Sequence, residues 1–208
     1  GDEKTVAPRL VQEFVRVRKE EDREAMLASL VCRSFNTRSI VFFETKKEAH
    51  NFFILMKALN MKACELHGNM TQLQRDLSLT QFTNGECEIL IATDVAARGL
   101  HIPSVTHVFN YDLPDDAEDY VHRIGRTGRA GQSGVAISFA CEKYALNLPA
   151  IEQYIQKTIP VTDYDRSALL DDVTPPTPRR RRSPNTRNSA RRGNSRGRGK
   201  PQQRNHKA

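Results

Sequence analysis

Long hydrophobic runs are missing from this 208-residue sequence, and so is an amino-terminal pattern of charged and then apolar residues. A membrane-spanning helix needs about 18 or more consecutive apolar residues, and a signal peptide needs that amino-terminal pattern. Cysteine is also scarce, with four residues set far apart, no Cys-x-x-Cys pair and no histidine at zinc-binding spacing. We therefore expect no membrane insertion, no secretion and no metal site in this chain. The cysteines should be small buried hydrophobic residues in a reducing cytoplasm.

Acidic residues are absent after Asp172, whereas residues 175–208 hold twelve lysines and arginines among Pro, Ser, Asn, Gly and Gln. The rest of the chain has 20 basic and 25 acidic residues, so the net charge of +7 comes from this tail. Such a composition buries too little apolar surface to offset chain entropy, and we expect the tail to be disordered. It could anchor RNA through phosphate contacts, or it could serve only for solubility or localisation.

Two phosphate-handling motifs are also absent. The sequence has no Gly-x-x-x-x-Gly-Lys-Ser/Thr loop to hold phosphates and no Asp-Glu-Ala-Asp box to hold Mg²⁺. Because phosphoryl transfer depends on such parts to position the phosphates and their metal ion, we do not expect this chain alone to hydrolyse ATP.

What is present is an alternation of strand and helix patterns. Two helix starts carry capping-box pairs, Thr45 with Glu48 and Thr71 with Gln74, and a further helix is predicted at 142–156, which Pro149 divides or bends. This alternation predicts an α/β fold with a mainly parallel sheet covered on both faces. β-branched or aromatic runs predict strands near residues 11–17, 39–43, 62–66, 88–92, 106–110 and 134–140.

Three arginines fall within seven positions in residues 122–131, His-Arg-Ile-Gly-Arg-Thr-Gly-Arg-Ala-Gly. Gly125 and Gly128 can turn the chain sharply with a positive φ, which would end a helix and point the guanidinium groups outward. A guanidinium binds phosphate oxygens in a bidentate way, so the run suggests an arginine finger. The alternative is a solvated basic turn.

A second constellation runs from the apolar strand 88–92 into Thr93, Arg98 and Gly99. Ligands of parallel sheets collect beyond the carboxyl ends of the strands. A hydroxyl, a positive charge and an approachable backbone N–H at that place suit a nucleotide phosphate or a nucleic-acid backbone.

Four segments, in this order along the chain, resemble motifs of the second RecA-like lobe of DEAD-box RNA helicases. They are Ser39-Ile-Val-Phe-Phe-Glu-Thr-Lys46, Gln72-Leu-Gln-Arg75, Ala92-Thr-Asp-Val-Ala-Ala-Arg-Gly99 and His122 to Arg129. The resemblance implies a RecA-like three-layer sandwich that works as one half of an ATP-dependent enzyme. A first lobe outside this chain would bind most of the ATP and Mg²⁺.

The resemblance also assigns residues to roles. Arg126 and Arg129 would reach the γ-phosphate as catalytic groups, with His122 linking nucleotide state to RNA grip, and Gly99 and His101 would lie at the nucleotide. His101 stands where the family usually has an Asp thought to meet the ATP ribose, which leaves its role open. RNA backbone contacts fall to Gln72, Arg75, Thr93, Asp94, Arg98 and Gly99, with His67 and Gly68 as either a further contact or a turn. Arg75 could instead pair with neighbouring side chains or be solvated.

Different parts of the chain resemble two branches of the family. Residues 92–161 look most like a bacterial RNA-degradation helicase, through Phe109-Asn-Tyr-Asp-Leu-Pro-Asp-Asp116 and Tyr144-Ala-Leu-Asn-Leu-Pro-Ala-Ile151. The front, Gln12-Glu-Phe-Val-Arg-Val-Arg18 and Thr45-Lys-Lys-Glu-Ala-His50, looks more like nucleolar ribosome-building helicases, so the chain could be a mosaic. The first branch implies the RNase E scaffold of the RNA degradosome as a partner and a cytoplasmic location; the second implies the nucleolus.

We expect residues 1–8 to be a linker from the first lobe, 9–165 a monomeric lobe domain and 166–208 the arginine-rich tail. The main rival function is a non-enzymatic RNA-binding or scaffold-docking module, and a DNA helicase lobe is a weaker alternative.

Overall fold

The computed structural model describes residues 6–34, 38–140 and 144–169. The arginine-rich tail and Cys141 therefore lie outside the described residues, and the expectations about them stay predictions. No helix in the described part of the chain is long and apolar enough to cross a membrane.

Seven strands form one sheet in the order β3-β4-β2-β5-β6-β1-β7, and every pair of neighbours is parallel. The first six lie where the sequence predicts them, within one residue of either bound. The strands are β1 (Leu10–Val17), β2 (Ser39–Phe43), β3 (Ala63–Leu66), β4 (Ile89–Thr93), β5 (His107–Asn110), β6 (Gly134–Phe139) and β7 (Val161–Tyr164).

The seventh strand, β7, was not predicted. Its side chains are alternately exposed and half-buried, and it includes Asp163 in a stretch that reads as the edge of the domain. It pairs with β1 in parallel, and Asp163 accepts from the Arg16 guanidinium of that strand at 2.5 Å. Long-range pairing, rather than local hydrophobicity, therefore makes this segment a strand.

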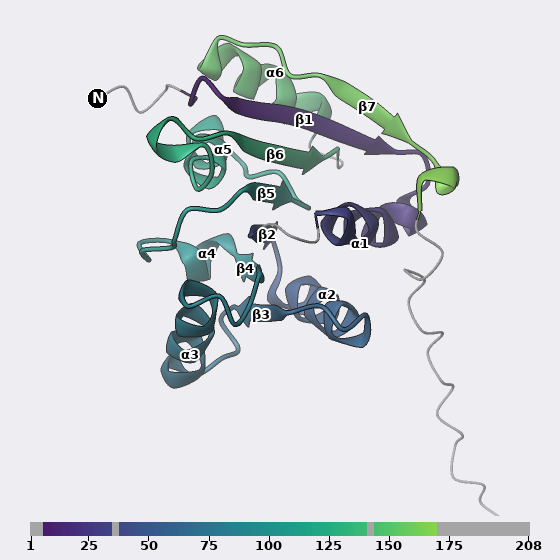
Figure 1. Ribbon diagram of the computed structural model, residues 1–208. Helices are drawn as coiled ribbons and strands as arrows, with labels where there is room; N and C mark the ends of the chain where they lie inside the picture. Colours follow the sequence, from purple (N-terminus) through teal and green to yellow (C-terminus); the bar gives the residue numbers. More distant parts are fainter. Residues whose placement is uncertain (1–5, 35–37, 141–143, 170–208) are drawn as a thin grey trace, which may run out of the picture. The chain divides into compact units, whose positions relative to one another are not determined.

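Helices cover both faces of the sheet, as predicted. In β2, Val41 and Phe43 point to the face covered by α1 and α2, while Ile40 and Phe42 point to the face covered by α3 and α4. Helices α5 and α6 pack on that second face, over β1 and β6. Figure 1 shows α1 and α2 on one side of the sheet, with α3, α4 and α5 on the other.

The helices are α1 (Arg23–Arg33), α2 (Lys46–Ala58), α3 (Gln72–Thr83), α4 (Asp94–Ala97), α5 (Ala117–Ile124) and α6 (Tyr144–Ile155), with short 3₁₀ turns at Glu20–Asp22, Arg129–Gly131 and Arg166–Ala168.

The two predicted helix starts are both capped. Thr71 and Gln74 form the full reciprocal capping box at the start of α3. At the start of α2, the Thr45 side chain accepts the Glu48 N–H at 3.2 Å, which is one of the two bonds of such a box. Pro149 lies inside α6, so this helix continues through the proline. The caps fix where α2 and α3 begin, α2 shortly after the carboxyl end of β2 and α3 after the turn that follows β3.

The two glycines of the arginine run behave differently. Gly128 has a φ of +68°, as expected of a glycine that turns the chain. Gly125 has a φ of −64°, so the expectation of a left-handed turn there is wrong. A Cβ at Gly125 would lie 3.1 Å from the Val121 carbonyl oxygen. Close packing of backbone in the last turn of α5, rather than a special backbone angle, thus favours glycine at this position.

Candidate nucleotide and RNA site

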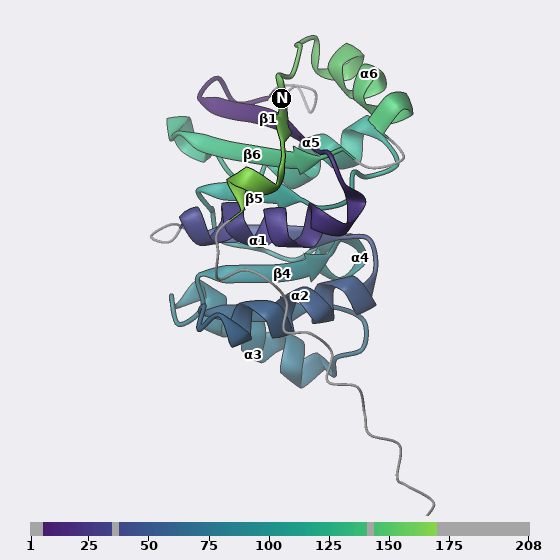
Figure 2. The same ribbon diagram turned by 90° about the vertical axis from the view of Figure 1, so that its right-hand side faces the viewer.

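The segment that follows β4 places polar groups at the carboxyl edge of the sheet. Thr93 ends the strand and is buried, and the single turn of α4 follows it at once. Gly99 then turns the chain with a φ of +75° and leaves its backbone exposed, with no atom within 4 Å of where a Cβ would be. Figure 2 shows α4 and α5 together at the side to which the arrows of β4 and β6 point. This is the edge at which parallel sheets bind ligands.

A small pocket of about 150 Å³ joins the two motifs that the sequence singles out. From the β4–α4 side it is lined by Asp94, Arg98 and Gly99, and from α5 and its end by His122 and Arg126. Of the predicted site residues, these five lie together at one opening. Gln72, Arg75, His67, Gly68, Thr93, His101 and Arg129 do not line this pocket.

Arg123 lies at the centre of this arrangement and was not assigned a role from the sequence. Its side chain is only 6% exposed. Its Nε donates to Asp94 at 3.2 Å and its Nη1 donates to the Asp112 carbonyl at 2.8 Å, with a longer bond of 3.4 Å to Asn110. The guanidinium also lies over the Phe42 ring, 5.2 Å from its centroid. Arg123 therefore fixes the start of α4 against α5, and its signal was its place in the arginine run.

The Asp94 carboxylate lies near two arginines. Besides Arg123, it faces Arg98 at 3.9 Å, and Arg98 also lies 3.7 Å from Asp119. Arg98 is 68% exposed, so these two contacts are weak, solvent-screened ion pairs. Arg98 therefore lines the pocket with a positive charge that these two carboxylates neutralise only in part.

Arg126 and Arg129 are two neighbouring cations at and just beyond the end of α5. Among the described residues, neither takes part in an ion pair within 4 Å. Instead, Arg126 donates to the Leu100 carbonyl at 3.4 Å and Arg129 donates to the Gly125 carbonyl at 2.7 Å. Burial, and then the nearby charge of Arg129, lower the pKa of the Arg126 guanidinium from its ordinary value, and the more distant Asp94 carboxylate offsets this only in part. Two half-buried like charges held this way are stabilised by an added anion.

The predicted RNA residues on α3 lie apart from this pocket. On the first turn of α3, Arg75 donates to the Gln72 side chain at 3.0 Å, and Gln72 donates to Asp76 at 2.8 Å. Arg75 thus has a side-chain partner, as the alternative interpretation of this residue foresaw, while Gln72 stays exposed. In the preceding turn His67 is buried and Gly68 is exposed, so of these two only Gly68 offers surface to an RNA backbone.

Comparison with known proteins agrees with this geometry. The profile of the helicase conserved C-terminal domain matches residues 22–131, just over half of the chain. The ATP-dependent RNA helicase RhlB of Vibrio vulnificus is 53% identical over 187 residues, which cover 90% of this chain and 42% of that protein. This chain therefore spans about two fifths of the length of such curated relatives. Because this alignment covers 90% of the chain, the front and the rear both match one protein, and the likeness does not require a mosaic of two branches.

Solved structures show the same likeness. The Escherichia coli DEAD-box protein SrmB, bound to regulator of ribonuclease activity A, superposes with a TM-score of 0.68 at 36% identity. That match covers 81% of this chain and 95% of the other. Saccharomyces cerevisiae Dbp5 bound to RNA and ADP BeF3 gives a TM-score of 0.68 at 36% identity, over 79% of this chain and 44% of the other.

Sheet, pocket and profile together define the C-terminal RecA-like domain of a helicase. Within that class, the chain belongs to the DEAD-box RNA helicase family as its C-terminal lobe, and it is similar to RhlB.

Proposed function

We propose that this lobe supplies one wall of an ATP site and part of an RNA-binding surface in a two-lobe, ATP-dependent RNA helicase. The observation that carries the proposal is the pair Arg126 and Arg129, two cations at and just beyond the end of α5, near the amino ends of β5 and β6, that form no ion pair within 4 Å among the described residues. A γ-phosphate is the anion that this arrangement fits, because guanidinium groups bind phosphate oxygens in a bidentate way. The first lobe would bind most of the ATP and its Mg²⁺.

Closure of the two lobes is then the catalytic switch. Only the closed form brings the arginines to the γ-phosphate, so neither lobe hydrolyses ATP by itself. His122 is exposed beside Arg126 in the pocket and would contact the first lobe, which links nucleotide state to RNA grip. Gly99 and His101 would lie along the nucleotide, with the imidazole of His101 as a hydrogen-bonding group in place of a carboxylate.

For RNA, the proposal places the sugar-phosphate backbone along Gln72, Arg75, Thr93, Arg98 and Gly99, with Gly68 beside α3. Asp94 would act indirectly, because its carboxylate holds Arg98 and Arg123. Contacts to backbone alone carry no base information, so binding should not depend on sequence. Short-range strand separation, rather than long translocation, follows from the family resemblance.

Reassembly tests the proposal directly. The chain is mixed with a matching first lobe, and ATP hydrolysis is measured with single-stranded RNA, with DNA of the same sequence and with no nucleic acid. We expect hydrolysis only when both lobes are present, with stimulation by RNA above that by DNA. Equal stimulation by DNA would favour the DNA helicase alternative, and no hydrolysis in the mixture would contradict the proposal.

The rival, a non-enzymatic RNA-binding module, makes the arginine-rich tail the main binding element. Six to ten phosphate contacts from such a tail would lose about 10³- to 10⁵-fold in affinity between 50 and 200 mM salt. Deleting residues 175–208 should therefore abolish the salt-sensitive RNA binding of the isolated chain, measured by fluorescence anisotropy. In the reassembled two-lobe enzyme, RNA-stimulated hydrolysis should survive the deletion. Its loss there would favour the rival.

The partner and the location are further parts of the proposal. We propose, from the family resemblance, a role in RNA degradation in the bacterial cytoplasm, with the RNase E scaffold docking on this lobe. The likeness to RhlB of a bacterium agrees with the bacterial branch, and none of the relatives named above supports the nucleolus. SrmB, in its solved structure, is itself in complex with a regulator of ribonuclease activity. A calorimetric titration with a purified scaffold segment tests the partner, and the absence of binding heat would remove it.

A further inference from the structure

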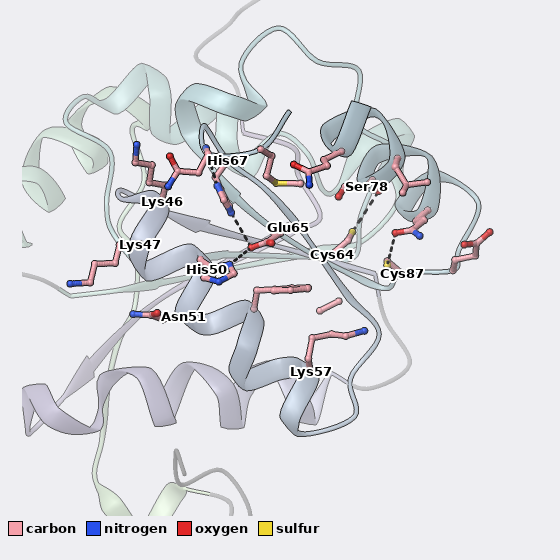
Figure 3. A pocket seen from close by; sticks show the side chains of 18 residues that line it. Lys46, Lys47, His50, Asn51, Lys57, Cys64, Glu65, His67, Ser78 and Cys87 are labelled. Atoms are coloured by element: carbon pink, nitrogen blue, oxygen red, sulfur yellow. Dashed lines mark hydrogen bonds and ion pairs between the residues drawn. The ribbon is translucent and has the colours of Figure 1, made fainter. Parts of the chain in front are cut away.

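A second, larger cavity of about 780 Å³ lies away from the arginine pocket, between α2, the edge strand β3 and α3. Three side chains that can bind a metal ion meet in it: His50 from α2, and Glu65 and His67 from β3 and its carboxyl end. Figure 3 shows these three side chains pointing toward one another, with dashed lines from Glu65 to both imidazoles. The sequence did not indicate them as a set, because His50 and Glu65 stand 15 positions apart.

One carboxylate oxygen connects the two imidazoles. Glu65 Oε2 lies 2.8 Å from His50 Nδ1 and 2.9 Å from His67 Nε2. The three ligand atoms all lie within 4.8 Å of one another. Unless protons or a cation lie between them, two nitrogen lone pairs and an anionic oxygen at such distances repel one another.

The three ligands come from fixed positions of the fold. Glu65 and His67 are two residues apart, so they point to the same face of the extended chain. His50 lies in the second turn of α2, a helix whose start is fixed by the Thr45 cap. His67 is buried and Glu65 is half-buried, whereas the His50 side chain is 50% exposed. Two ligands are therefore held by the protein and the third stands at the cavity mouth.

Two imidazole nitrogens and one carboxylate oxygen form a ligand set that zinc prefers, with bonds of about 2.0 to 2.2 Å and a fourth position open to water. We propose that His50, Glu65 and His67 bind a Zn²⁺ ion. The ion would sit between the three atoms, after a shift of a few tenths of an ångström away from their present hydrogen-bonding distances.

Protons must rearrange when the ion binds. The Asn69 N–H donates to His67 Nδ1 at 3.3 Å, so in the metal-free protein the ring proton lies on Nε2 and is donated to Glu65. Zinc takes the Nε2 lone pair, and that proton moves to Nδ1. The Asn69 N–H, which lies in an exposed turn, then bonds to water. On His50 the proton moves from Nδ1 to Nε2 on the exposed side of the ring. No net proton release is needed. Zinc replaces three hydrogen bonds with three coordinate bonds, and the Asn69 N–H keeps a partner in water.

The site would connect α2 to the end of β3 and to the turn that leads into α3. That turn ends at Thr71, the cap of the helix that carries Gln72 and Arg75. Bound zinc would therefore fix the position of the α3 start. This role depends only on the fold and does not rest on the proposed function.

The test uses the full chain after treatment with a chelator. Zinc chloride is titrated in by calorimetry, and thermal melts are recorded with and without excess zinc. We expect one ion per chain and a rise in the melting temperature of about 5 to 10 °C when zinc is about 100-fold above its dissociation constant. His50→Gln and Glu65→Gln should each weaken binding at least tenfold. His122→Gln, which removes an exposed histidine on α5, is the matched control and should bind as the parent chain does.

The cavity also contains Cys64 and Cys87, which offer a different metal site, so a second measurement separates the two. Co²⁺ bound by nitrogen and oxygen gives visible bands without the near-ultraviolet charge-transfer band of thiolate ligands. We expect visible bands alone. A thiolate band, binding that is unchanged in His50→Gln and Glu65→Gln, or no binding at millimolar zinc would each overturn the proposal. Melts in chelator show whether the variants fold.

Discussion

Replacing Arg126 with alanine in the reassembled two-lobe enzyme is expected to lower RNA-stimulated ATP hydrolysis by about 10³-fold or more. An arginine brought to the γ-phosphate contributes about 10³ to 10⁵ in rate, because it stabilises charge in the transition state. Among the described residues Arg126 makes one side-chain hydrogen bond, a long one of 3.4 Å to a carbonyl, so its loss should cost less than about 1 kcal/mol of stability. The rate is measured at saturating RNA and ATP, and the stability by thermal melting.

The control for this variant is Arg16→Ala, which removes an exposed arginine on β1 that pairs with Asp163 of the edge strand. It should leave the hydrolysis rate within about twofold of the parent, because this ion pair is exposed to solvent and the residue lies outside the pocket. Arg129→Ala should follow Arg126→Ala in direction. An unchanged rate in both variants would refute the arginine-finger assignment.

Replacing Arg123 with alanine is expected to damage stability as well as activity. The change removes a buried cation that donates hydrogen bonds to Asp94, to Asn110 and to the Asp112 carbonyl. Breaking a buried pair by removing one partner costs about 3 to 5 kcal/mol, and the partial exposure of Asp94 reduces this to about 2 to 3 kcal/mol. The melting temperature should fall by about 5 to 10 °C.

Arg98→Ala is the matched comparison, because it removes the other arginine that faces Asp94. Arg98 is 68% exposed and its ion pairs are 3.7 Å or longer, so the melting temperature should change by no more than about 2 °C. If the Arg123 and Arg98 variants melt at the same temperature, Arg123 does not hold α4 against α5 as described. Thermal melting of the isolated lobe measures the melting temperature of each variant.

Local pattern predicted most of the sheet. The apolar runs of β2 and β4 are buried at every position, and parallel strands covered on both faces have that composition. The edge strand β7 escaped prediction because it is half-exposed and carries Asp163, so its own sequence gives little sign of pairing. Only the position of β1 beside it makes residues 161–164 a strand.

The site was predicted in its composition better than in its geometry. Motif spacing pointed to Arg126, Gly99 and His122, which line one pocket. It could not show that Arg123 turns inward while its neighbours stay available, because helix direction and burial decide that. The group of His50, Glu65 and His67 was hidden for a similar reason, since it depends on how α2 lies over the edge strand. The Glu-x-His spacing within an extended segment was the only local sign.

The place of β1 in the sheet bears on how the lobe forms during synthesis. This strand leaves the ribosome before the other strands of the lobe, yet its two neighbours are β6 and β7, and its partner for Leu10 is Gly134, 124 positions later. Residues 39–110 can join β2, β3, β4 and β5 while β1 still waits with both edges open. Closing such distant pairs is slow, and an unpaired strand can associate with other chains in the meantime. Nascent lobes should therefore need protection, by a chaperone or by a neighbouring domain, until β7 has emerged.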